Sequence, residues 1–176
     1  MACQIINLVL SFVTRTIFIQ TLGSDYLGVN GLFSNILSIL SFAELGIGNA
    51  IVFSMYRPLA ENDSSRLAAL MSLYKKAYLV IFAIVTIAGL AVIPFLHSII
   101  NGEPNISENL SLIYLLFLAN TAISYLVVYK KSILTADQKN YIVLSATEVA
   151  HILQIVLQIY VLYQYHSFIG FLVIQI

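Results

Sequence analysis

The stretch SILSFAELGIGNAIVF, from Ser38 to Phe53, is apolar enough to lie in a lipid bilayer, yet it carries Glu44 near its middle. A charged side chain at the centre of a membrane helix costs about 2.5–3.5 kcal/mol on insertion scales. The chain must offset that cost by pairing Glu44 with another polar or charged group, or by placing it in a water-filled cavity. Ionisable residues inside membrane helices usually mark functional sites, so the surroundings of Glu44 bear on what the protein does.

The composition of the whole chain predicts a membrane protein. Of its 176 residues, 60% are hydrophobic and only 9% are charged, whereas a soluble domain carries about 25% charged residues. So little charge cannot cover a globular surface. The formal net charge is zero, which gives no indication of nucleic-acid binding, and the single cysteine, Cys3, excludes an internal disulfide.

Five apolar segments are long enough to cross a hydrocarbon core of about 30 Å, which needs about 20 helical residues. We predict spans at residues 3–22, 31–55, 77–97, 110–129 and 142–162, and the start of a sixth at Phe168. Both ends are abrupt, so we expect a fragment truncated at each end. The expected fold is an all-α membrane protein, a polytopic helical bundle with residues 1–176 as a single transmembrane domain.

Lysine and arginine residues in the loops set the predicted orientation, because cytoplasmic loops are enriched in both. Four lie in segment 57–76 and three in loop 130–140, whereas the outer loop 98–109 has none. The N-terminus is therefore predicted to be cytoplasmic. Segment 57–76 resembles a short interfacial helix capped by Asp63 or Ser64, or, more conservatively, a helical lead-in to the third span.

Polar side chains recur at helical spacing in several spans. At 100° per residue, one face of the first span carries Gln4, Asn7, Ser11 and Arg15. The fifth span has Thr147, His151, Gln154 and Gln158 on one face, with Glu148 beside them, and the fourth has Asn120, Thr121 and Ser124. The small residues of the second span, including Ser41, are typical of close helix packing. The economical arrangement turns these faces toward one shared aqueous cavity.

Alternatives stay open for the charged residues. Arg15 and Glu44 are expected to form an interhelix salt bridge, or Arg15 binds an anionic ligand, or both hold and the pair opens when the ligand arrives. Glu148 and His151 form either a structural hydrogen-bonded pair or a proton or cation site. We find no third zinc ligand, no phosphate-binding loop and no catalytic motif. Neither a metal, a cofactor nor an enzyme activity is predicted.

Four features carry a family resemblance: Arg15, the turn LGSDYLG (Leu22–Gly28), the stretch ELGIGNA (Glu44–Ala50) and the exit YRPLAEND (Tyr56–Asp63). With them, residues Phe12–Tyr78 closely resemble the start of the bacterial polysaccharide transporters. These are lipid-linked oligosaccharide flippases of the multidrug/oligosaccharidyl-lipid/polysaccharide exporter superfamily. The rest of the chain matches by topology only.

The resemblance implies two six-helix lobes, about twelve to fourteen helices in an inverted V, that work by alternating access. This chain would supply most of the N-terminal lobe, and the C-terminal lobe would be its partner. The implied substrate is an undecaprenyl-pyrophosphate-linked oligosaccharide, flipped across the bacterial cytoplasmic membrane for O-antigen or capsule synthesis. A proton or sodium ion is the implied coupling ion.

These expectations assign roles to the polar residues. We expect substrate contacts from Arg15, Ser11, Asn7, Gln4 and Ser41, because an arginine fork and neutral polar groups suit a pyrophosphate and its sugars. Ion coupling is expected from Glu44, Glu148 or His151, and further cavity lining from Asn120, Ser124, Gln154 and Gln158. The alternatives are a multidrug cation antiporter of the same superfamily, a membrane enzyme of glycan assembly, or an assembly protein without transport activity.

Overall fold

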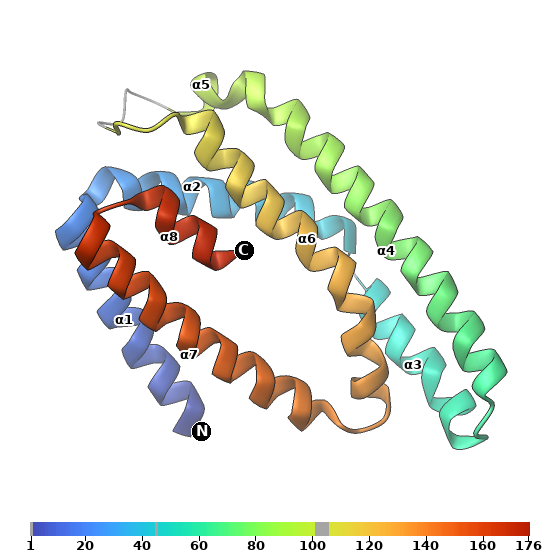
Figure 1. Ribbon diagram of the computed structural model, residues 1–176. Helices are drawn as coiled ribbons and strands as arrows, with labels where there is room; N and C mark the ends of the chain where they lie inside the picture. Colours follow the sequence, from blue (N-terminus) through green and yellow to red (C-terminus); the bar gives the residue numbers. More distant parts are fainter. Residues whose placement is uncertain (1, 45, 101–105) are drawn as a thin grey trace.

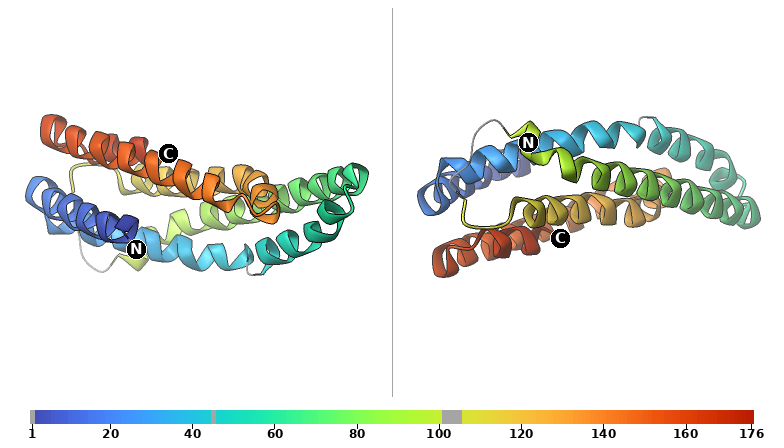
Figure 2. Two further views of the ribbon diagram at one scale, coloured as in Figure 1. Left: turned by 90° about the horizontal axis from the view of Figure 1, so that it is seen from below. Right: turned by 90° about the horizontal axis from the view of Figure 1, so that it is seen from above.

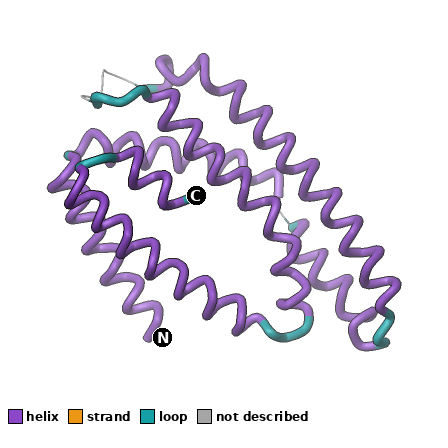
Figure 3. Tube along the Cα trace, in the orientation of Figure 1, coloured by secondary structure: helices purple, strands orange, loops and turns teal. Residues whose placement is uncertain are grey.

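The computed structural model describes residues 2–44, 46–100 and 106–176, and every regular element in these ranges is helical (Figures 1 and 3). Side chains are described for these ranges apart from residues 2–6, 43, 97 and 98. The helices are α1 (Ala2–Leu22), α2 (Ser24–Leu40), α3 (Ile47–Ala60), α4 (Ser64–Val92), α5 (Leu96–Ile99), α6 (Leu110–Ala136), α7 (Asn140–Tyr165) and α8 (Phe168–Gln175). Two short 3-10 turns lie at Ser41–Glu44 and Ile93–Phe95.

The helices form two packed groups, which α2 and α6 connect. In one group, α4 and α6 lie side by side in opposite directions, and α3 packs against both (Figure 1). In the other group, α1 and α7 run in the same direction, and α8 turns back to pack on α7 (Figures 1 and 2). Helix α2 contacts α1 and then crosses to α6 and α4.

Three helices are long and apolar enough to cross a membrane: α4 with the following turn (Ser64–Phe95), α6 and α7. Residues Asn7–Leu22 of α1 form a shorter apolar helix. The side chains that these helices turn outward are largely apolar, such as Leu8, Ile87 and Val149. Such large apolar outer faces are typical of helices that contact hydrocarbon or further apolar protein surface. The prediction of an all-helical bundle is therefore confirmed, with three helices that could cross a membrane in place of five uninterrupted spans.

The second predicted span, residues 31–55, is wrong as a single helix. Helix α2 ends at Leu40, and a 3-10 turn follows as far as Glu44. Gly46 then adopts the left-handed conformation, with φ of 83°, before α3 begins. Only glycine occupies that region without steric cost. Glu44 therefore lies at an interruption between two helices, not in the middle of one.

Glu44 has a partner on α4. The Tyr78 hydroxyl donates a hydrogen bond of 2.9 Å to the Glu44 Oε1 atom. Gly48, in the first turn of α3, leaves room for this contact, because a Cβ atom there would lie 3.3 Å from the Tyr78 hydroxyl oxygen. The helix interruption is thus tied to the neighbouring long helix through a half-buried carboxylate.

Replacing Tyr78 with phenylalanine is expected to lower the free energy of unfolding by about 1–3 kcal/mol, the cost of leaving a half-buried polar group without its donor. Thermal unfolding in detergent, followed by circular dichroism, measures the loss. Tyr160→Phe is the matched control, because Tyr160 is exposed on α7. Equal melting temperatures for the two variants would show that the Glu44–Tyr78 bond contributes nothing.

The α4–α6 interface holds the tightest packing. Gly89 of α4 is buried. The Tyr114 hydroxyl of α6 donates a hydrogen bond of 3.1 Å to the Gly89 carbonyl oxygen. Leu118, one turn further along α6, fills the space above Gly89. Phe33 of α2 meets the rings of Tyr114 and Phe117 edge-on, with centroids 5.3 and 5.9 Å away. These contacts join α2 to the α4–α6 pair.

The turn between α3 and α4 shows how segment 57–76 folds. Asp63 caps α4 and accepts a hydrogen bond of 2.9 Å from the Arg66 backbone N–H, as the sequence predicts. Arg57 and Arg66 form ion pairs with Glu61. Because α4 continues without a break from Ser64 to Val92, residues 64–76 are the lead-in to the third span and not a separate interfacial helix.

The turn between α6 and α7 is also charged. The Lys139 ammonium lies 2.6 Å from an Asp137 carboxylate oxygen. This hydrogen bond to Asp137 raises the pKa of Lys139 above its ordinary value. At the opposite end of the bundle, the Tyr26 hydroxyl bonds to Glu108 and Ser107, which fastens the start of α2 to the start of α6.

Candidate functional site

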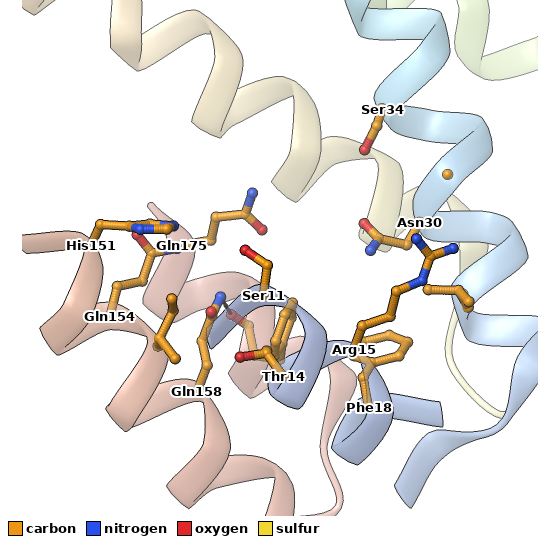
Figure 4. Close-up of a pocket in the computed structure, with 14 residues that line it drawn as sticks. Ser11, Thr14, Arg15, Phe18, Asn30, Ser34, His151, Gln154, Gln158 and Gln175 are labelled. Atoms are coloured by element: carbon orange, nitrogen blue, oxygen red, sulfur yellow. Dashed lines mark hydrogen bonds between the residues drawn. The ribbon is translucent and has the colours of Figure 1, made fainter. Parts of the chain in front are cut away.

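A polar cavity of about 440 Å³ lies between α1, α2, α7 and α8 (Figure 4). All four helices contribute polar side chains to its lining. These are Ser11, Thr14 and Arg15 from α1, Asn30 and Ser34 from α2, His151, Gln154 and Gln158 from α7, and Gln175 from α8. Neutral amides and hydroxyls dominate, with one permanent cation and one histidine among them.

Helical periodicity explains why these residues converge. Ser11, Arg15 and Phe18 follow one another at spacings of four and three along α1, so they share one face. Asn30 and Ser34 repeat at a spacing of four along α2. Gly31 lies between them on the lining and has no side chain, so it leaves space open toward α1. The polar stripe of the first span thus faces protein and the cavity.

Among the described residues that line the cavity, Arg15 is the only one with a permanent charge. It lies seven residues before the end of α1, about 10 Å along the helix axis at 1.5 Å per residue. Its side chain extends from α1 toward α2, beside Asn30 (Figure 4). The guanidinium is exposed, and no hydrogen bond or ion pair joins it to any residue that the structure describes. An unpaired guanidinium at this depth is available to an anion.

Aromatic rings and a buried amide hold one end of the cavity in place. Phe18 meets Phe168 and Phe171 of α8 edge-on, with ring centroids 5.5 and 5.2 Å away. Gln158 is 4% exposed, and its Nε2 atom donates a hydrogen bond of 3.2 Å to the Phe171 carbonyl oxygen. This bond ties α7 to α8, so Gln158 has a structural role in addition to its place on the lining.

Asn7 and Glu148 lie one helical turn from the cavity, where α1 and α7 pack together. The Asn7 Nδ2 atom donates a hydrogen bond of 2.7 Å to the Glu148 Oε2 atom. The Asn7 Oδ1 atom is buried and has no partner among the described residues. Neither residue lines the cavity, although both were expected at the site. Gln4 was expected beside them, but its side chain lies outside the described residues.

The expected salt bridge between Arg15 and Glu44 does not form. Glu44 bonds to Tyr78 in the other group of helices, and no ion pair within the described ranges joins it to Arg15. The cavity therefore keeps its cation unneutralised.

Three further residues that were expected at the cavity lie outside its lining. The Ser41 hydroxyl donates a hydrogen bond of 2.9 Å to the Leu37 carbonyl oxygen at the end of α2. On α6, the Ser124 hydroxyl donates a hydrogen bond of 2.7 Å to the Thr121 carbonyl oxygen. Asn120, also on α6, is half-buried. Helix α6 therefore adds no described side chain to this cavity, whose lining comes from the first, second and fifth predicted spans and from the start of the sixth.

The sequence reasoning missed several lining residues. Asn30 falls just before the second predicted span, and Ser34 is one of the small residues interpreted as packing contacts, yet their i, i+4 spacing is a signal of a polar helix face. Thr14 was overlooked beside Arg15. Gln175 lies in the short final helix, whose partner was unknown from the sequence.

The lining can bind an anion that also carries hydroxyl groups. Arginine donates in a planar fork that matches phosphate oxygens, and amide side chains both donate to and accept from sugar hydroxyls. No group of three His, Cys, Asp or Glu side chains suited to a metal ion occurs in the described part of the chain. No family model, curated protein or solved structure matches this chain.

Proposed function

We propose that this chain is part of a flippase that moves undecaprenyl-pyrophosphate-linked oligosaccharides across the bacterial cytoplasmic membrane for surface polysaccharide synthesis. The observation that carries the proposal is the unpaired Arg15 on the wall of a polar cavity inside a bundle with membrane-crossing helices. The resemblance of residues 12–78 to polysaccharide transporters supports the same substrate.

The physical difficulty in flipping such a lipid is to carry two phosphates and several sugars past hydrocarbon. Removing ionised groups from water without compensation costs many kcal/mol. Arg15 replaces part of the phosphate hydration with charge-assisted hydrogen bonds. Asn30, Gln154 and Gln175 provide hydrogen bonds to the sugar hydroxyls, while the prenyl tail stays in the lipid.

The proposed orientation of the chain in the membrane rests on the charge distribution. Apart from Arg15, every Lys and Arg lies in segment 57–76 or in loop 130–140, and such residues favour the cytoplasmic side. We therefore place the N-terminus in the cytoplasm and the Tyr26–Glu108 contact at the outer face. A second lobe of the same protein would complete the cavity and alternate its access.

Flipping of a fluorescent undecaprenyl-pyrophosphate oligosaccharide in reconstituted vesicles tests the proposal. We expect the protein to accelerate flipping and not to transport a lipophilic cationic dye, because Arg15 repels cations and no carboxylate occurs among the described lining residues. Extrusion of the dye without flipping would indicate the multidrug antiporter instead. Elongation or cleavage of the oligosaccharide would indicate an enzyme of glycan assembly.

A further inference from the structure

Four lysines near one end of the bundle have no partner within the protein. They form two adjacent pairs, Lys75 with Lys76 on α4 and Lys130 with Lys131 on α6. All four residues are exposed, and no hydrogen bond or ion pair joins their ammonium groups to any residue that the structure describes. Their charges are therefore available to a group outside the chain.

The other cations at this end, which carries the α3–α4 and α6–α7 turns, are already neutralised. Arg57 and Arg66 pair with carboxylates of the α3–α4 turn, and Lys139 pairs with Asp137. The acidic side chains of both turns are thus engaged with these three residues. The two lysine pairs keep their charge uncompensated, although they belong to the same end of the bundle.

The packing of α4 on α6 places the two lysine pairs at about the same level. Gly89 contacts Tyr114 and Leu118 across the interface, and the two helices run in opposite directions (Figure 1). Lys75 lies 14 residues before Gly89, and Lys131 lies 13 residues after Leu118. Each separation corresponds to about 20 Å along a helix at 1.5 Å per residue. We call these four lysines the lysine belt.

Each lysine of the belt has an exposed apolar residue one helical turn closer to the middle of its helix. Residues four apart on a helix share a face. On α4 these neighbours are Leu79 and Val80, and on α6 they are Leu126 and Val127, with exposed fractions between 42% and 55%. The apolar surface continues along both helices at Ile84, Ile87 and Ile123. Each helix thus presents two cations followed by an apolar face.

This order of groups matches that of a phospholipid, in which a phosphate is followed by acyl chains. We propose that the lysine belt is a binding site for anionic phospholipids, with their phosphates on the ammonium groups and their acyl chains along the apolar faces. Ammonium groups form charge-assisted hydrogen bonds with phosphate oxygens, and basic residues beside membrane helices attract anionic head groups. A soluble phosphate or an acidic protein would use the cations but leave the apolar faces uncovered.

The belt anchors only one of the two groups of helices. Helices α7 and α8 contain no Lys or Arg, and the single cation of α1 is Arg15 on the cavity wall. Flanking lysines and arginines help to set the tilt and depth of membrane helices. Anionic lipid therefore fixes the depth of α4 and α6 and leaves α1 and α7 without an equivalent contact. This inference does not depend on the transport proposal.

Tryptophan fluorescence can report on the lipid beside the belt, because the chain contains no tryptophan of its own. Leu126→Trp places a reporter one turn from the belt, and Leu112→Trp places one near the opposite end of α6, at positions 42% and 45% exposed. Nanodiscs that contain either phosphatidylglycerol or phosphatidylcholine with identical brominated acyl chains quench the reporter through lipid that touches it.

We expect the anionic lipid to be preferred about five-fold or more at the Leu126→Trp reporter, because each lysine near a membrane surface contributes about that factor. The Leu112→Trp reporter should show no preference for the anionic lipid. High salt should weaken the preference, since exposed charges are screened. Equal quenching by the two lipids at Leu126→Trp overturns the proposal.

Paired variants separate the belt from the general charge of this end. Lys130→Gln with Lys131→Gln should abolish the preference at Leu126→Trp, and Lys130→Arg with Lys131→Arg should retain it. Arg57→Gln with Arg66→Gln removes the same charge from residues that already have partners, so the preference should persist. An equal loss in the arginine and glutamine variants of the two regions overturns the assignment to the belt.

The α4 half of the belt provides an independent test if the α6 variants fail to fold. Leu79→Trp should report the same preference, and Lys75→Gln with Lys76→Gln should abolish it. Polyglutamate added to nanodiscs of pure phosphatidylcholine tests an acidic soluble partner instead. A response of Leu79→Trp to polyglutamate, without any preference for the brominated anionic lipid, overturns the lipid assignment.

Discussion

Replacing Arg15 with alanine is expected to weaken binding of undecaprenyl pyrophosphate by about 10- to 100-fold, because hydrogen bonds to charged groups contribute about 1.5–3 kcal/mol each. Arg15 is the one permanent cation on the lining and has no partner in the described structure. Its removal leaves the phosphates with neutral donors only. Binding to the purified protein in nanodiscs, measured by microscale thermophoresis, gives the ratio directly.

The surroundings of Arg15 make this a clean experiment. Because the guanidinium is exposed and unpaired, alanine at position 15 leaves no buried group without a partner, so the melting temperature should change little. Arg15→Lys should recover part of the affinity, since lysine keeps the charge but not the planar fork. Arg57→Ala removes an equal charge at the α3–α4 turn and is the control. Parent-like affinity in Arg15→Ala would remove Arg15 from the binding site.

Gly89→Leu is expected to give the largest loss of stability, about 3 kcal/mol or more, at the upper end of what overpacking costs. A Cβ atom at this position would lie 2.3 Å from the Leu118 Cδ1 atom and 2.9 Å from its Cδ2 atom. Leu118 is 3% exposed and has little room to move. The larger side chain also pushes α4 away from Tyr114, which donates to the Gly89 carbonyl oxygen.

Gly28→Leu is the matched control, because a Cβ atom at Gly28 meets nothing within 4 Å. Combining Gly89→Ala with Leu118→Ala should cost less than the sum of the two single changes, since the smaller residue at 118 vacates the space that the new methyl group needs. Unfolding in increasing denaturant, at constant lipid or detergent, gives each free energy. Equal losses at Gly89 and Gly28 would contradict the close packing of α4 on α6.

The long spans were predictable because their signal is local. Runs such as the one around Ile87 are apolar over the length that a bilayer requires, so α4, α6 and α7 could be found from hydropathy alone. The cap at Asp63 was predictable for the same reason, since it depends on residues within one turn.

The interruption between α2 and α3 was not predicted, because the glycines near Glu44 were interpreted as packing residues. Gly46 has positive φ and Gly48 approaches the Tyr78 hydroxyl, and nothing local distinguishes these two uses of glycine from ordinary helix contacts. The partners of the polar residues were also beyond the sequence. Asn7 meets Glu148 only because α1 and α7 pack in one particular register, which many distant contacts fix together.

The gap between Leu40 and Ile47 has a consequence for how the bundle can change shape. Helix α3 is held by α4 and α6, whereas α2 carries Asn30 and Ser34 on the cavity wall and packs on α1 as well as on α4 and α6. A single continuous helix in place of α2 and α3 would transmit any tilt of its first half to its second half. Two shorter helices joined through a left-handed glycine do not, so the orientation of α2 is set by its own contacts with α1 and α6 and not by the axis of α3.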